Sequence, residues 1–473
     1  MLFNSAVFFA FFALVYSVYL ACGRRTSWQN GWLLLASYVF YGWWDWRFLS
    51  LIVISTGVDF VLANAMAATE DAGKRKRLVM TSVVTNLSIL AFFKYAGFFV
   101  DSMATSLTAL GVEANLPLLN IVLPVGISFY TFQTLSYTID VYRGQLKPTR
   151  SLLNFALFVS FFPQLVAGPI ERAAALLPQV ERERHIDFAQ VERGLNLVLW
   201  GLFKKVVLAD NCARIADQVF NSGGEAQGLS LIVGALAFTI QIYGDFSGYT
   251  DIARGISKMM GFELMLNFRI PYLAVSPSDF WRRWHISLSS WLRDYLYISL
   301  GGNRGGPLLT YRNLALTMLL GGLWHGASWN FVIWGAFHGA ILVLYRVTPG
   351  LNRDPRLDGT AKTALVWASR VALMFTLTVI GWVLFRCHTW EQIVWWFTSV
   401  GIGLSDDTFV LARTVVACAI PLAAVQGLQA WTGDLDVMMR GNAVTRGLWW
   451  ALLIIGMGLF GVREAAEFIY FQF

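Results

Sequence analysis

Apolar stretches recur along the whole chain from Leu2 to Phe473, and short polar segments separate them. A helix that crosses a membrane needs about 20 predominantly apolar residues. This criterion predicts ten to twelve spans, approximately at 2–21, 31–45, 49–67, 79–100, 120–141, 194–212, 229–256, 309–324, 328–345, 364–386, 407–428 and 447–463. The pattern therefore predicts an all-α, polytopic integral membrane protein.

Two regions depart from the pattern of simple spans. The segment Leu152–Ile170 is apolar but contains Pro163 and Pro169, which disfavour a straight helix. Irregular backbone at membrane depth persists only where protein or a water-filled cavity shields it, so we expect a re-entrant element here. Residues 262–306 form the least hydrophobic long block, rich in Trp, Arg and Ser, and this composition predicts interfacial helices.

Composition excludes a water-soluble protein. The chain of 473 residues is 56% hydrophobic and 14% charged, whereas soluble domains carry roughly 25% charged residues. We therefore expect one membrane domain over residues 1–473, with a motif-bearing core at about 120–345. The four cysteines lack the spacing of metal ligands, so no metal site is expected.

The net charge of +7 does not indicate a nucleic-acid partner, because the basic residues stand in short clusters between apolar segments. Such clusters orient membrane helices. Clusters at Arg24-Arg25, Lys74–Arg77 and Arg143–Arg150 alternate with Asp101–Asn120, which contains acids and no base. The alternation predicts that the N-terminus lies outside.

The segment Ser276–Tyr295 has the start signal and the periodicity of one amphipathic helix. Ser276 can cap the free N–H groups, Pro277 suits the first turn, and Asp279 suits the positive end of the helix dipole. Aromatic and apolar residues recur on one face and basic and hydroxyl residues on the other. The first face has Trp281, Trp284, Leu288, Trp291 and Tyr295, and the second has Arg282, Arg283, Ser289, Ser290 and Arg293. One interpretation is an interfacial helix at the lipid headgroups.

His285 supports a second interpretation of this segment. It falls on the apolar side of the helix, where water is scarce and an imidazole needs a partner. In this interpretation Arg282, Arg283 and Arg293 hold the phosphates of a nucleotide-bearing donor, because a planar guanidinium binds phosphate oxygens in pairs. Trp284 is then a candidate substrate contact, and His285 faces inward as a candidate catalytic residue.

His325 lies deep in an apolar run, between Leu319–Leu323 and Phe331–Phe337. Ionisable side chains inside a membrane are costly and by default mark a pathway or a reaction site. Desolvation disfavours an imidazolium, which leaves a neutral ring able to act as a general base. The alternative is a structural histidine hydrogen-bonded between helices. Trp324 and Asn330 are candidate substrate contacts, since the Asn330 amide can fix a ring tautomer or polarise a carbonyl.

Two carboxylates, Asp245 and Asp251, lie within another apolar stretch. Gly244 and Gly248 have the small-xxx-small spacing of tight helix contacts. Two interpretations stay open. Either the stretch is a packing element with a salt bridge to Arg254, or Asp245 orients a histidine of the substrate site.

Six motifs taken together are specific, although each alone is weak. They are Pro124–Phe132, Phe162–Ile170, Asp245–Asp251, Asp279–Tyr297, Gly301–Arg304 and Leu323–Asn330. On these motifs the chain resembles the membrane-bound O-acyltransferase (MBOAT) family, and especially its alginate O-acetyltransferase branch and the relatives that serve other exported polysaccharides, including cellulose. Residues 346–473 match no motif of the family.

The resemblance implies a cytoplasmic tunnel for a donor, an opposing outer funnel, and a catalytic histidine between them. His325 matches the essential histidine of the family. His285 matches its second position, often asparagine in eukaryotic members and histidine in the polysaccharide and teichoic-acid branches. No bound cofactor is expected, acetyl-CoA is the expected acyl donor, and the expected location is the bacterial inner membrane. A periplasmic acetyltransferase partner or the polymer itself would accept the acetyl group.

Two rival interpretations belong to other functional classes. A transporter or flippase would line a substrate path with these histidines, but transporters often show paired halves, and the sequence has no internal repeat of that kind. A scaffold would only recruit a soluble acetyltransferase.

Overall fold

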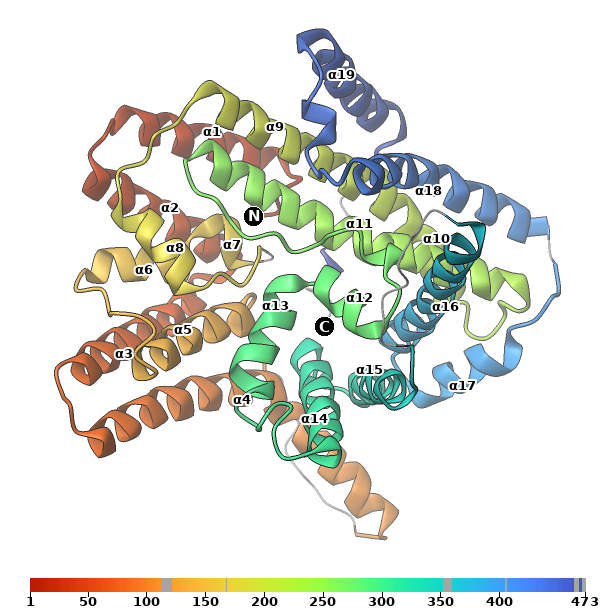
Figure 1. Cartoon of the computed structure of the whole chain (residues 1–473), viewed down its shortest axis with the longest axis horizontal. Helices are drawn as coiled ribbons and strands as arrows, with labels where there is room; N and C mark the ends of the chain where they lie inside the picture. The colour runs from red at the N-terminus through yellow and green to blue at the C-terminus, as the bar shows by residue number, and fades with distance from the viewer. Residues whose placement is uncertain (113–120, 167, 352–359, 405, 463–467, 470–473) are drawn as a thin grey trace. The chain divides into compact units, whose positions relative to one another are not determined.

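The computed structural model of the chain describes residues 1–112, 121–166, 168–351, 360–404, 406–462 and 468–469, and its regular elements are all helical over these residues (Figure 1). The α-helices are α1 (Ala6–Ala21), α2 (Thr26–Asp45), α3 (Leu49–Ala67), α4 (Ala72–Ala109), α5 (Ile127–Tyr142), α6 (Leu152–Ser160), α7 (Phe162–Leu165), α8 (Ala173–Glu181), α9 (Phe188–Phe203), α10 (Asp210–Phe220), α11 (Leu229–Met259), α12 (Pro277–Arg283), α13 (Ile286–Trp291), α14 (Pro307–His325), α15 (Trp329–Val347), α16 (Ala361–Arg386), α17 (Trp390–Ser399), α18 (Asp406–Thr432) and α19 (Ala443–Phe460). Two π-helical segments, Lys204–Ala209 and Leu292–Tyr297, continue α9 and α13. Each predicted span falls on one or more of these helices, so the all-α prediction is confirmed. Residues 120 and 463 of the predicted spans lie outside the described residues.

Seven helical segments among the described residues are long and apolar enough to cross a membrane. They are Thr26–Ala67, which contains α2 and α3, Ala72–Ala109, Leu229–Met259, Trp329–Val347, Ala361–Arg386, Asp407–Thr432 and Ala443–Phe460. The chain is therefore a polytopic membrane protein, as predicted. The larger total of ten to twelve spans and the outside location of the N-terminus stay predictions.

The chain packs into two compact units. The first comprises Met1–Gly194 and Ile256–Met265, and the second comprises Leu195–Gly255 and Leu266–Phe473. The single membrane domain expected for residues 1–473 stays a prediction.

In the first unit, α3 packs against α4 and α5, and α2 packs against α6. The region Leu152–Ile170 is broken as predicted, because α6 ends at Ser160 and the short α7 begins at Phe162. Ala167 lies outside the described residues. The placement of this region as a re-entrant element in a membrane stays a prediction.

In the second unit, glycines bring the backbones of α14 and α15 into contact. A Cβ atom on Gly322 would lie 2.2 Å from the carbonyl oxygen of Phe331, and one on Gly335 would lie 2.5 Å from that of Met318. No side chain larger than hydrogen fits at such distances. The contact fixes His325, the last residue of α14, relative to α15.

We expect Gly322→Ala to lower the melting temperature, because the added methyl group forces α14 and α15 apart at a cost of about 1–3 kcal/mol. Thermal unfolding of the purified protein in detergent measures the effect. Gly447→Ala is the matched control, since a Cβ there meets no atom within 4 Å and alanine favours a helix. Equal melting temperatures for the two variants would contradict the backbone contact.

The structure corrects the single helix predicted for Ser276–Tyr295. Its start is as predicted, since the Ser276 side chain accepts a hydrogen bond from the Asp279 N–H and Pro277 follows at the first position. However, α12 ends at Arg283 and α13 begins at Ile286, because His285 adopts a left-handed conformation with φ of 43°. The break buries Trp284 and His285, which are 1% and 0% exposed.

Candidate active site

Aromatic side chains enclose His325, which is 6% exposed. The ring centroids of Trp324, Trp334 and Phe385 lie 5.0, 5.1 and 5.4 Å from that of His325, and all three planes are nearly perpendicular to the imidazole. Edge-to-face contacts of this kind are favourable and directional. Aromatic side chains from α14, α15 and α16 thus fix the orientation of the imidazole.

His285 packs against Trp324 as well. Its ring centroid lies 5.8 Å from Trp324, 6.4 Å from His325 and 4.7 Å from Phe246 of α11. His285 lies outside the seven apolar segments, and burial lowers its pKa to about 3 because desolvation penalises the imidazolium. The structure therefore brings the two predicted histidines together, with His285 neutral at physiological pH.

Asn267 fixes the chain that follows His285. Its backbone oxygen accepts a hydrogen bond from the Ile286 N–H at 3.0 Å. Its Oδ1 accepts from the backbone N–H and the hydroxyl of Ser287, at 3.2 and 3.0 Å. These bonds to a loop residue hold the first turn of α13, although the sequence analysis did not single out Asn267.

A cavity of about 550 Å³ lies beside His325 and is lined from α12, α13, α14, α15 and the π-helical segment Leu292–Tyr297. This volume is within the range of about 300–1,000 Å³ for small-molecule sites. Its apolar wall includes Trp281, Leu288, Leu292, Met318 and Trp334. His325 is therefore reached by a cavity and is not sealed between helices.

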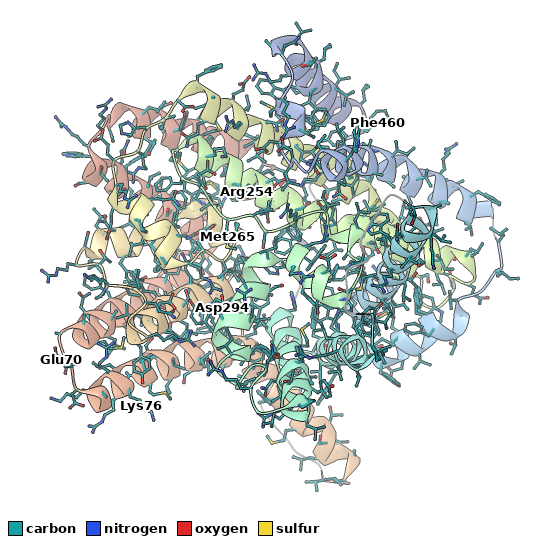
Figure 2. The ribbon with its side chains drawn as sticks, in the orientation of Figure 1. Glu70, Lys76, Arg254, Met265, Asp294 and Phe460 are labelled. Atoms are coloured by element: carbon teal, nitrogen blue, oxygen red, sulfur yellow. The ribbon has the colours of Figure 1, made fainter. Side chains whose placement is uncertain are left out.

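Three arginines line the same cavity, namely Arg269, Arg282 and Arg293. Arg282 lies 3.7 Å from Asp279, and Arg293 binds Asp294, which Figure 2 labels. The side chains of Arg282 and Arg293 are 64% and 65% exposed, so both guanidinium groups remain accessible to an anionic ligand.

Two of the three predicted arginines are thus placed together. Arg283 is not among the residues that line the cavity. Its Nε donates a hydrogen bond to Asp279 at 2.9 Å, which secures the last turn of α12. Arg269 was missed, because it lies in an irregular segment without periodicity. Its N–H donates to the Arg283 carbonyl oxygen at 2.9 Å, which places it beside the end of α12.

Three further predicted residues are not among those that line the cavity. The ring of Trp324 contacts the rings of both histidines. Trp284 packs against Phe268 and Trp382, with centroid distances of 4.9 and 4.7 Å. Asn330 accepts a hydrogen bond from the Ser328 hydroxyl in the first turn of α15. Contact of Trp284, Trp324 and Asn330 with substrate stays a prediction.

Asp245 has a lysine partner. Lys205 Nζ lies 2.9 Å from Asp245 Oδ1 and 2.9 Å from Asp210 Oδ1, and the Ile469 N–H donates to the other Asp245 oxygen at 2.7 Å. The predicted salt bridge to Arg254 is confirmed, and it forms with the other carboxylate, Asp251. These contacts agree with the packing interpretation of the stretch, and Lys205 adds a partner for Asp245 that this interpretation did not include. A role of Asp245 in substrate binding stays a prediction.

The family model for membrane-bound O-acyltransferases matches residues 145–387, which is more than half of the chain and includes every candidate site residue. The chain belongs to the membrane-bound O-acyltransferase family. It is therefore a multi-pass membrane acyltransferase, and the activity expected from the sequence is confirmed at this level.

Relatives within the family cover most of the chain. The chain is 46% identical to the probable alginate O-acetylase AlgI of Azotobacter vinelandii, over 100% of both chains. It is 36% identical to the peptidoglycan O-acetyltransferase of Helicobacter pylori, over 83% of this chain and 78% of that protein. It is also 26% identical to the teichoic acid D-alanyltransferase of Bacillus subtilis, over 56% of this chain and 69% of that protein.

Proposed function

We propose that this acyltransferase takes an acetyl group from cytoplasmic acetyl-CoA and passes it to a hydroxyl group on the outer side of the bacterial inner membrane. The purpose is O-acetylation of an exported polysaccharide, alginate. One observation carries the proposal: His325 lines a cavity whose wall also holds Arg269, Arg282 and Arg293. A base and a set of phosphate-binding side chains on one cavity are what a CoA thioester requires.

In the proposed reaction, His325 removes the proton from the acceptor hydroxyl, and the oxygen attacks the thioester carbonyl carbon. The tetrahedral intermediate expels the CoA thiolate, which takes the proton back from His325. The products are an O-acetyl ester and free CoA, and the imidazole returns to its neutral form. General-base catalysis of this type contributes a factor of about 10²–10⁴ in rate.

We assign His285 to positioning. It is not among the residues that line the cavity, and it packs against Trp324, which in turn packs against His325. A neutral His285 supports this cluster of rings without adding a charge near the base.

Similarity to the relatives supports the proposed acceptor and polymer. Similarity to proteins named alginate O-acetylase and peptidoglycan O-acetyltransferase supports a polysaccharide outside the cytoplasm as the final acceptor. The full-length identity of 46% favours alginate over another exopolysaccharide such as cellulose. The hydroxyl that attacks first belongs either to a periplasmic acetyltransferase partner or to the polymer itself.

Acetyl-CoA labelled in its acetyl group tests the proposal with the purified protein. The transferase should release free CoA thiol and pass the label to alginate or to the partner protein. A transporter or flippase would leave the thioester intact. A scaffold would release thiol only through the enzyme that it recruits. Label transfer without any added enzyme would therefore exclude the scaffold hypothesis.

The arginine assignment gives a separate prediction. Arg282→Gln and Arg293→Gln should each raise KM for acetyl-CoA about tenfold with a smaller effect on kcat, because a charge-assisted hydrogen bond to phosphate contributes about 1.5–3 kcal/mol. Initial rates of thiol release measure both constants. Arg283→Gln is the matched control, since Arg283 binds Asp279 and is not among the residues that line the cavity. An equal rise in KM for Arg283→Gln would overturn the assignment.

A further inference from the structure

A second cavity, of about 200 Å³, lies in the same unit and has its own lining. It is bounded by α9, α11, α18, the loop that follows α18, and α19. Phe268 and Ile270 line this cavity, whereas Arg269 between them lines the cavity of His325. The two cavities share no lining residue, and the segment 268–270 borders both. The second cavity is therefore separate from the one assigned to the acyl donor.

The second cavity contains two cations that share one carboxylate. Lys204 Nζ lies 2.7 Å from Asp251 and 2.9 Å from the hydroxyl of Ser247, and its side chain is 3% exposed. Arg254, labelled on α11 in Figure 2, lies 3.4 Å from the same Asp251. The other acid of the lining, Asp436, is exposed on the loop after α18. Apart from Asp436, the lining thus has two cations and one carboxylate, an excess of positive charge.

Arg254 also has an unused hydrogen-bond donor. Its Nε is buried and has no acceptor among the described residues. Leaving a buried charged donor without an acceptor is unfavourable, and the absence of bulk water within a membrane increases the penalty. An anionic oxygen in the cavity would accept this hydrogen bond and balance the excess charge.

The surroundings of the cavity point to a lipid as the source of that oxygen. The apolar windows of α18 and α19 are only 28% and 6% buried within the structure, so lipid covers most of both helices in a membrane. Ile420 of α18 and Leu448 and Leu452 of α19 are among their exposed apolar residues. Basic pockets between membrane helices bind the headgroups of anionic lipids.

We propose that the second cavity binds the phosphate of an anionic phospholipid through Lys204 and Arg254, with the acyl chains lying on α18 and α19. The phosphodiester accepts the free N–H of Arg254, and the apolar helix surfaces accept the chains. The ring centroids of Trp200 and Tyr243 each lie 5.8 Å from Lys204 Nζ, so two aromatic rings flank the cation. The site requires no acyl transfer, so its test is independent of the proposed function.

Lipid retention by the purified full-length protein tests the proposal. After equal exposure to phosphatidylglycerol and phosphatidylcholine in detergent, native mass spectrometry should show preferential retention of phosphatidylglycerol. Arg254→Gln should lower that retention about tenfold, the effect of losing one charge-assisted hydrogen bond. Arg254→Lys, which keeps the charge but lacks the Nε donor, should give an intermediate value. Phosphatidylglycerol should also raise the melting temperature of the wild type more than that of Arg254→Gln, because a ligand of the native state stabilises it.

Arg440→Gln is the matched control, because Arg440 is an exposed arginine close in sequence to the cavity lining and paired with Asp434. It should retain phosphatidylglycerol as the wild type does. An equal loss in Arg440→Gln, or full retention in Arg254→Gln, would overturn the proposal. A further arm adds inorganic phosphate to the delipidated protein. If phosphate alone raises the melting temperature through Arg254 as much as phosphatidylglycerol does, the ligand is free phosphate and the lipid assignment is wrong.

Discussion

Replacing His325 with alanine is expected to reduce acetyl transfer by a factor of about 10²–10⁴, the usual contribution of a general base. His325 is the imidazole that reaches the cavity of the three arginines, so its loss leaves the acceptor hydroxyl protonated while the donor still binds. Release of CoA thiol and transfer of labelled acetyl groups measure the loss. KM for acetyl-CoA should change much less than kcat.

The enclosed position of His325 requires a control for packing. His325→Ala removes a ring that contacts Trp324, Trp334 and Phe385, whereas His325→Phe fills the same space without a proton acceptor. Both variants should be inactive, and His325→Phe should melt close to the wild type. His185→Ala, at an exposed position, should keep full activity. Activity in folded His325→Phe would exclude His325 as the base.

The helices themselves could be predicted from apolar run length. The predicted ranges 229–256 and 364–386 correspond to Leu229–Met259 and Ala361–Arg386 in the structure. A run of apolar residues predicts a membrane helix because transfer into lipid depends on each side chain's own polarity, and not on which distant residue it meets. Tertiary contacts change this outcome little.

The break at His285 could not be predicted in this way. Periodicity assumes that the same backbone angles continue, and the left-handed conformation of one non-glycine residue interrupts them. The bonds from Asn267 to Ile286 and Ser287 determine where α13 restarts. Such partners are set by tertiary structure, so the local sequence of Ser276–Tyr295 does not reveal them.

The residues of the candidate site were likewise only partly predictable from the local sequence. His325 was identifiable because an ionisable residue in an apolar run is unusual wherever its neighbours lie. Phe385 contacts it from α16, in a stretch that is apolar throughout and gives no sign of a site. The partner of Asp245 illustrates the same limit. The salt bridge of Arg254 with Asp251 joins close neighbours in the sequence and could be predicted, whereas Lys205 of the π-helical segment Lys204–Ala209 is distant from Asp245 in the sequence.

The largest loss of stability is expected from Lys205→Met. The Lys205 side chain is 2% exposed and joins Asp210 of α10 to Asp245 of α11, whose side chains are 2% and 3% exposed. Removing the cation leaves two buried carboxylates without their counter-charge, which costs about 3–5 kcal/mol. We expect a strongly lowered melting temperature and little folded protein, measured by fluorescence-detected size exclusion and thermal unfolding.

Two further variants separate the ion pair from a general effect of mutation. Arg440→Met breaks the exposed pair with Asp434, which contributes about 0–1 kcal/mol, and should melt near the wild type. In the triple variant Lys205→Met, Asp210→Asn and Asp245→Asn, no buried charge is left uncompensated, so part of the lost stability should return. A Lys205→Met protein as stable as Arg440→Met would show that the buried pair does not hold α10 to α11. Recovery in the triple variant would show that Asp245 serves the fold through its ion pair with Lys205.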